Sequence, residues 1–121
     1  MRLDKFTTRF QEALSDAQSL ALGNDNQYIE PQHLLRALLA QNDGAARALL
    51  SRAGVNVNGL QTALDAAIKR LPQVSGTNEV QIGRDLVNLL NATEKEAIKR
   101  NDQFIASELF LLAVSDDKGE T

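Results

Sequence analysis

The sequence contains an internal duplication, which limits the folds that this chain can adopt. Residues 10–38 align with residues 86–114 without a gap, at a shift of 76 residues. The two copies are identical at 6 of the 29 aligned positions, and several other positions exchange one apolar residue for another. Because apolar residues recur at equivalent positions in the two copies, we expect both copies to present the same face to a core, as repeated structural units do. The identities are Leu14/Leu90, Ala21/Ala97, Gln27/Gln103, Ile29/Ile105, Leu35/Leu111 and Ala37/Ala113, and the exchanges include Phe10/Leu86, Leu22/Ile98, Tyr28/Phe104, Leu34/Phe110 and Leu38/Val114.

The length of the first copy predicts that the second copy is incomplete. The first copy continues through further helical patterns as far as Leu71. At the same shift the second copy would end at residue 147, whereas the sequence ends at Thr121. We therefore expect a piece of a longer polypeptide, with a first repeat at about 6–71, a connection at 72–82 and an incomplete second repeat at about 83–121.

Helical periodicity predicts an all-α domain, because apolar residues recur at three- and four-residue spacing and strand patterns are slight. The clearest stripe, on the fourth predicted helix, consists of Leu60, Ala63, Leu64, Ala67, Ile68 and Leu71. The predicted helices of the first copy cover 8–22, 31–40, 45–52 and 57–71, and two helices of the second copy cover 83–100 and 107–115.

Residues at the helix ends support these boundaries. Thr7 or Thr8 can cap the first helix, and Gln11 is spaced to complete a capping box with Thr8. Gly23 is expected to end that helix in a left-handed backbone. Pro31 suits the first turn of the second helix, because its missing N–H has no helical partner there.

Composition excludes several classes of function. A net charge of −3 argues against a nucleic-acid-binding domain, which usually has a clustered basic face. No apolar run approaches the roughly 18 residues that span a membrane, and the start of the chain lacks the apolar stretch of a signal peptide. The absence of cysteine fits a reducing compartment. We therefore expect a cytoplasmic domain that binds neither nucleic acid nor membrane.

The sequence offers no catalytic constellation, so we expect this segment not to be an enzyme. His33 is the single histidine, and no cluster of residues has the spacing of metal ligands. A phosphate-binding loop of the G-x-x-x-x-G-K-[ST] type is also absent. We expect His33 to be a buried structural residue, and the domain to be a helical repeat module that binds a partner.

Several segments resemble the amino-terminal domain of the Clp ATPases, and two resemble the ClpB disaggregases most closely. The general resemblance rests on Phe6-Thr7, on Ala17-Gln18-Ser19-Leu20-Ala21-Leu22-Gly23 and on Ile29-Glu30-Pro31-x-His33-Leu34-Leu35. The ClpB resemblance rests on Arg70-Leu71-Pro72-x-Val74 and Phe104-Ile105-x-Ser107-Glu108-Leu109.

The resemblance implies a Clp repeat fold, in which two four-helix repeats are related by a pseudo-twofold axis. It implies a chaperone of the stress response, whose amino-terminal domain binds unfolded or aggregated polypeptides. That domain delivers them to downstream AAA+ modules of the same chain, which form a hexamer and use ATP and Mg²⁺; no cofactor is expected in this segment. The alternative is an adaptor-docking or regulatory domain of another Clp ATPase, similar to ClpA or ClpC.

The resemblance also implies a substrate-binding surface. Its polar residues are Thr7, Asp102 and Glu108, and its groove positions are Ala92, Glu96 and Leu109. Only Leu109 keeps the apolar bulk typical of that groove, and a position in the core is an equally good interpretation of this residue. For Thr7, a simple helix-capping role is an equally good interpretation. The acidic pair that binds phosphoarginine in ClpC falls here on Gln32 and Glu108, so half of that guanidinium site is missing.

Overall fold

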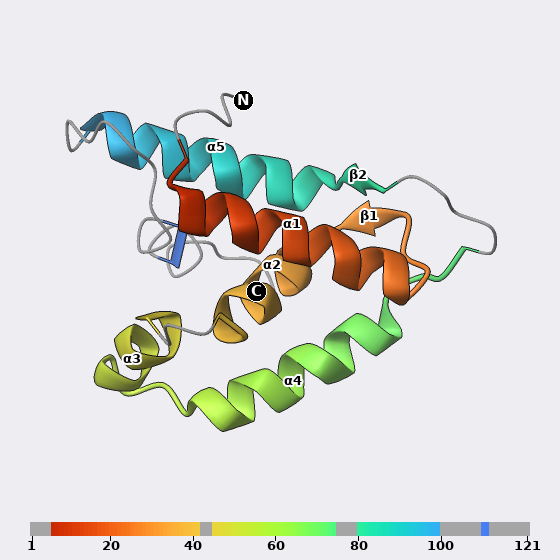
Figure 1. Ribbon diagram of the computed structural model, residues 1–121, viewed down its shortest axis with the longest axis horizontal. Helices are drawn as coiled ribbons and strands as arrows, with labels where there is room; N and C mark the ends of the chain where they lie inside the picture. The colour runs from red at the N-terminus through yellow and green to blue at the C-terminus, as the bar shows by residue number, and fades with distance from the viewer. Residues whose placement is uncertain (1–5, 42–44, 75–79, 100–109, 112–121) are drawn as a thin grey trace.

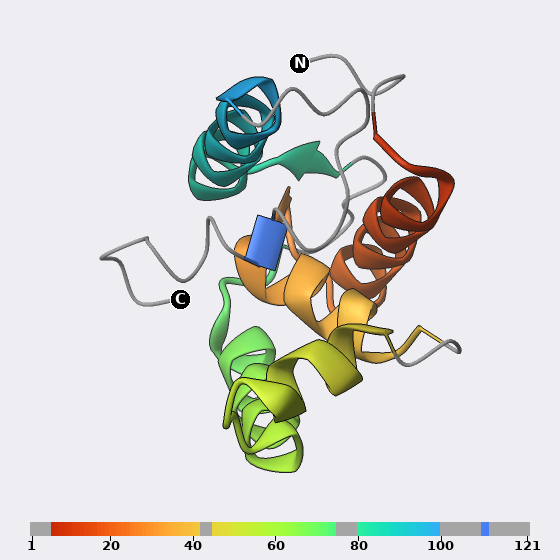
Figure 2. The ribbon, with the colours of Figure 1, turned by 90° about the vertical axis from the view of Figure 1, so that its left-hand side faces the viewer.

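The computed structural model describes residues 6–41, 45–74, 80–99 and 110–111, and the described parts are mainly helical (Figure 1). Views from two sides place α5 at one end of the molecule and α3 and α4 at the other, with α1 and α2 between them (Figures 1 and 2). The elements are α1 (Thr8–Gly23), β1 (Tyr28–Ile29), α2 (Pro31–Leu39), α3 (Ala45–Arg52), α4 (Val57–Arg70), β2 (Gln81–Ile82) and α5 (Arg84–Lys99).

The start of α1 is capped by Thr7. Its hydroxyl oxygen accepts a hydrogen bond from the Phe10 N–H at 3.2 Å, which satisfies one of the free amides of the first turn. The expected capping box between Thr8 and Gln11 is not part of the described cap. The Gln11 amide instead donates to the Phe6 carbonyl at 2.8 Å.

The end of α1 differs from the prediction at Gly23. This residue is the last of the helix, and its φ is not positive. The left-handed backbone occurs two residues later, at Asp25, where φ is 56°. Aspartate tolerates this conformation better than most residues with a side chain. The predicted stop after α3 is confirmed at Gly54, where φ is 89°.

The helix α2 lies at the centre of the first repeat, between α1 and α4 (Figure 1). An interior helix has apolar residues around most of its circumference, and α2 shows that pattern. Its buried residues are Pro31, His33, Leu34, Leu35, Ala37, Leu38 and Leu39.

Part of the predicted apolar pattern is exposed. On α4, Leu64 and Ile68 are buried, whereas Ala63 is exposed. The duplicated pair Leu22/Ile98 is also exposed, with exposed fractions of 38% and 64%. Some of the apolar positions that the two copies share therefore lie outside the core-facing side of α1 and α5.

A short parallel strand pair joins the two repeats, although the sequence predicted no strand. In this pair, β1 aligns with β2 in the register Tyr28–Gln81 and Ile29–Ile82. The Gly83 N–H then donates to the Ile29 carbonyl at 3.0 Å, just before α5 begins. The connection between the repeats is thereby held against the loop that follows α1.

The apolar residues of both repeats form one core. Phe10 of α1 lies between Phe6 and Phe110, with ring centroids 4.9 Å and 5.7 Å away. Leu86 and Leu90 of α5 belong to the same buried cluster. Of the helix predicted over 107–115, the structure describes only Phe110 and Leu111, which are helical and buried.

Candidate functional site

The predicted substrate-binding surface is described in part. Thr7 is half-buried at the start of α1, and its hydroxyl is engaged as the helix cap. Ala92 and Glu96 lie one turn apart on α5, which places them on one side of that helix. Ala92 is exposed, and Glu96 is half-buried. A carboxylate four residues from a small exposed side chain leaves this face of α5 polar rather than apolar.

The other three predicted residues, Asp102, Glu108 and Leu109, lie outside the described residues. The next residue along the chain, Phe110, contacts the ring of Phe10, which is three residues after Thr7. The start of α1 and the second repeat therefore meet at this ring contact.

The predicted structural role of His33 is confirmed by its burial and its hydrogen bonds. Its Nδ1 accepts from the Glu30 N–H at 2.8 Å, so the neutral ring carries its proton on Nε2. Nε2 lies 2.9 Å from the Asn26 Oδ1 and donates to it. Burial lowers the pKa of His33 from the usual 6.5 to about 4, because the charged ring would lose its hydration. The ring is thus a neutral structural group at physiological pH.

A carboxyl group at the junction of the repeats is also perturbed. Burial raises the pKa of Glu30 above its ordinary value, and the Asp85 carboxylate at the start of α5 adds to this rise. Glu30 lies against Gly83, where an added Cβ would collide with the Glu30 carboxylate. This arrangement lies at the contact between the two repeats.

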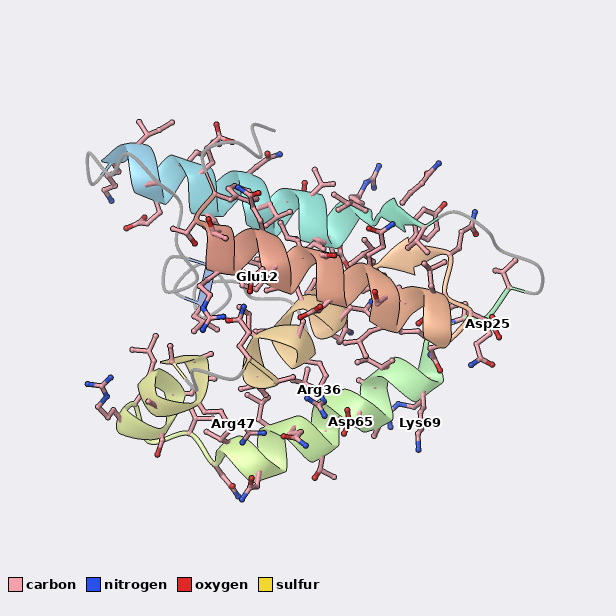
Figure 3. All side chains as sticks on the ribbon, in the orientation of Figure 1. Glu12, Asp25, Arg36, Arg47, Asp65 and Lys69 are labelled. Atoms are coloured by element: carbon pink, nitrogen blue, oxygen red, sulfur yellow. The ribbon has the colours of Figure 1, made fainter. Side chains whose placement is uncertain are left out.

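Three helices of the first repeat line an open groove that the sequence did not reveal. We call it the first-repeat groove; it has a volume of about 620 Å³. Arg36 of α2 and Asp65 of α4 point toward one another in it, with Nε and Oδ1 2.8 Å apart (Figure 3). The lining of the groove also includes Asp16, Leu20, Ala37, Ala40, Ile68 and Lys69.

Local periodicity could not reveal this groove, because its walls come from α1, α2 and α4. The duplication is the sequence feature that could have indicated this groove. At the shift of 76 residues, Ala92 aligns with Asp16 and Glu96 aligns with Leu20. Two of the predicted groove positions in the second repeat thus have counterparts in the first-repeat groove.

Among the residues that the structure describes, no three acidic or histidine side chains gather in a way that could hold a metal ion. No helix among them is both long enough and apolar enough to cross a bilayer.

Comparison with solved structures identifies the same fold in other amino-terminal domains. The structure of the N-terminal domain of the ClpV1 ATPase from E. coli superposes with a TM-score of 0.86 at 24% identity, covering 95% of this chain and 70% of that one. The Hsp104 N-terminal domain from Candida albicans gives a TM-score of 0.83 at 20% identity, covering 94% and 75%.

Comparison with curated sequences gives closer relatives. The chaperone protein ClpB of Vibrio cholerae is 52% identical over 120 residues, which are 98% of this chain. ClpB of Pseudomonas putida is 45% identical over 121 residues, or 99% of this chain. The chain spans about 14% of the length of each of these relatives. The profile of the Clp repeat (R) N-terminal domain family matches residues 5–121, and the chain belongs to that family.

Proposed function

We propose that this chain is the substrate-recruiting domain of an ATP-dependent protein disaggregase. In this proposal it binds unfolded or aggregated polypeptide in the cytoplasm and does no chemistry itself. Hexameric AAA+ modules of the same polypeptide use ATP and Mg²⁺ to translocate the bound chain. The observation that carries the proposal is the 52% identity to a ClpB chaperone along 98% of this chain.

The surface of the domain supports a role in binding polypeptide. Leu20 is exposed on α1 and Ile98 on α5, and exposed apolar side chains favour contact with the apolar segments that unfolded chains present. The ClpV N-domain has been solved in complex with a VipB peptide, and that complex superposes on this chain with a TM-score of 0.81 at 23% identity. Peptide binding on a domain of this fold therefore has a precedent.

Titration with fluorescently labelled, permanently unfolded casein tests the proposal. We expect saturable binding by the chain, and weaker binding after Glu108→Ala. At Thr7 the capping and binding roles are separated by a pair of substitutions. Thr7→Asn keeps an N-cap and Thr7→Ala removes it, so a binding role for the threonine side chain predicts that both variants weaken binding.

The results distinguish the possible outcomes. Binding that Thr7→Asn preserves and Thr7→Ala weakens would assign Thr7 to helix capping alone. No binding of casein at any concentration would contradict recruitment, and would favour the alternative that the domain docks a folded adaptor, as in a ClpA- or ClpC-like ATPase.

A further inference from the structure

We propose that the first-repeat groove is a second polypeptide-binding site, which takes an apolar segment carrying one basic and one acidic side chain. The inference rests on the proposed function, because it assigns part of the recruitment of non-native chains to this groove. It concerns a different surface from Thr7 and the second repeat.

The lining of the groove provides an apolar contact surface. Leu20 comes from α1, Ala37 and Ala40 from α2, and Ile68 from α4. Leu20 keeps 38% of its surface exposed although it is a large apolar residue. The volume of about 620 Å³ lies within the range of pockets that bury small ligands or a few side chains. Small alanine side chains on α2 leave room for a segment to lie against that helix.

The walls of the groove are held in place before any partner binds. The Asn24 side-chain amide donates to the Ile68 carbonyl at 2.8 Å, which ties the end of α1 to the end of α4. The Arg36–Asp65 ion pair connects α2 to α4. A preformed site does not pay the cost of ordering its walls when a partner binds.

The charges at the rims define the chemistry of the partner. Asp16 lies exposed on α1, and Lys69 lies exposed on α4. Among the residues that the structure describes, neither has an ion-pair partner, in contrast to Arg36 and Asp65, which line the same groove and pair with each other. A segment with a basic side chain toward Asp16 and an acidic one toward Lys69 would complement both rims.

The duplication supports the assignment of this face to binding. Asp16 and Leu20 align with Ala92 and Glu96 of the second repeat, two residues of its predicted surface. Each repeat therefore has one carboxylate and one apolar side chain at these two positions, in exchanged order. The first repeat keeps the larger apolar side chain, and its counterpart on α5 is a glutamate.

Fluorescence anisotropy tests the proposal with a labelled, leucine-rich peptide that carries one arginine and one glutamate. In Leu20→Ser we expect about tenfold weaker binding, because the contact with the buried peptide leucines is lost. In Asp16→Asn we expect a loss of about two- to fivefold that disappears at high salt, as for an exposed ion pair.

Matched variants control for changes that are not specific to the groove. Leu22→Ser removes an equally exposed leucine of the same helix that does not line the groove, and it should change binding by less than about twofold. Glu12→Gln removes an exposed carboxylate one turn from Asp16, also outside the groove, and should have a similarly small effect. Thermal unfolding of each variant establishes that it is folded.

Three outcomes decide the matter. Binding that is weakened about tenfold in Leu20→Ser and about two- to fivefold in Asp16→Asn, with wild-type binding in both controls, supports the proposed groove site. If both groove substitutions leave the binding of casein and of the peptide unchanged, the proposed groove site is wrong. The proposal that the domain recruits polypeptide then still stands. If the wild-type chain binds neither casein nor the peptide, both the recruitment proposal and the groove proposal are wrong.

Discussion

The ring of His33 and the side chain of Asn26 form a buried hydrogen bond, with Nε2 and Oδ1 2.9 Å apart. The Asn26 amide nitrogen in turn donates to the carbonyl of Pro72 at 3.1 Å. One asparagine therefore connects the first turn of α2 with the segment that follows α4. Because buried polar groups are costly without partners, this chain of bonds makes the single histidine of the sequence a structural element of the first repeat.

The titration of His33 is the first prediction. Because the folded pKa is about 4 and the usual value is 6.5, the unfolded chain holds more protons between these two pH values. The stability that His33 contributes is therefore complete above pH 6.5 and is lost as the pH falls from 6.5 toward 4. NMR of the histidine ring, followed against pH, should show a neutral ring at pH 5. A midpoint near 6.5 would contradict the buried, neutral ring.

The Glu30 carboxyl changes the stability with pH in the opposite direction to His33, so its contribution must be separated from that of the histidine. Its raised pKa means that the folded chain binds this proton more tightly than the unfolded chain does. Acidification through that raised pKa therefore stabilises the fold. In the Glu30→Gln variant this contribution is absent, so urea unfolding should show a steeper loss of stability below pH 6.5 than in the wild type.

Substitution of Asn26 is the second prediction. Asn26→Ala leaves the His33 N–H and the Pro72 carbonyl without their partners, and should lower the free energy of unfolding by about 2–4 kcal/mol. Asn26→Asp keeps an acceptor for His33 and should raise its pKa, because a carboxylate stabilises the charged ring. Urea unfolding measures the first effect and the NMR titration the second. A change below about 0.5 kcal/mol in Asn26→Ala would show that the network carries little stability.

The sequence predicted the parts of the structure that local rules govern. Five of the predicted helices agree with α1 to α5 within one or two residues where both are described, because each combines an apolar period with an end signal such as Thr7, Pro31 or Gly54. The burial of His33 was also predicted correctly. These features depend on residues close together in the chain.

Features that depend on distant segments were missed. A strand of two residues, such as β1 or β2, has no periodicity to detect, and its register is set by the partner strand. The exposure of Leu22 and Ile98 depends on which neighbours cover each helix. The first-repeat groove needs three helices to meet. The predicted binding residues Asp102, Glu108 and Leu109 lie outside the described ranges, so their role stays a prediction.

Gly83 and Gly23 provide a matched pair for the third prediction. A Cβ at Gly83 would lie 3.2 Å from the Ile29 carbonyl oxygen and would collide with the Glu30 carboxylate. The Glu30 carboxylate can turn away from an added methyl group, so Gly83→Ala should cost about 1 kcal/mol of stability, mainly through the tight approach to the Ile29 carbonyl. At Gly23, a Cβ would meet nothing within 4 Å.

The control variant should move in the other direction. Because Gly23 is helical and its φ is not positive, Gly23→Ala should be neutral or should stabilise the fold by up to about 1 kcal/mol. Urea unfolding of the two variants gives both values. Equal effects at the two glycines would show that close approach at Gly83 does not limit the side chain there.

The contact between Phe10 and Phe110 is the basis of the fourth prediction, because it joins α1 to the second repeat. Phe10 is fully buried, so Phe10→Ala should cost about 3–5 kcal/mol, a large part of the 5–15 kcal/mol that typically stabilises a domain. Phe10→Leu gives a milder version if the alanine variant does not fold. Ile98→Ala, at a position 64% exposed, should change stability by less than about 0.5 kcal/mol.

A double-mutant cycle isolates the ring contact itself. Unfolding free energies of Phe10→Leu, Phe110→Leu and the double variant should give a coupling of about 0.5–1.5 kcal/mol, as for other buried aromatic pairs. Such a coupling would establish that the second repeat stabilises the first through this contact. Strict additivity of the two substitutions would instead mean that each ring is stabilised by its own repeat, and that the described contact contributes no energy between them.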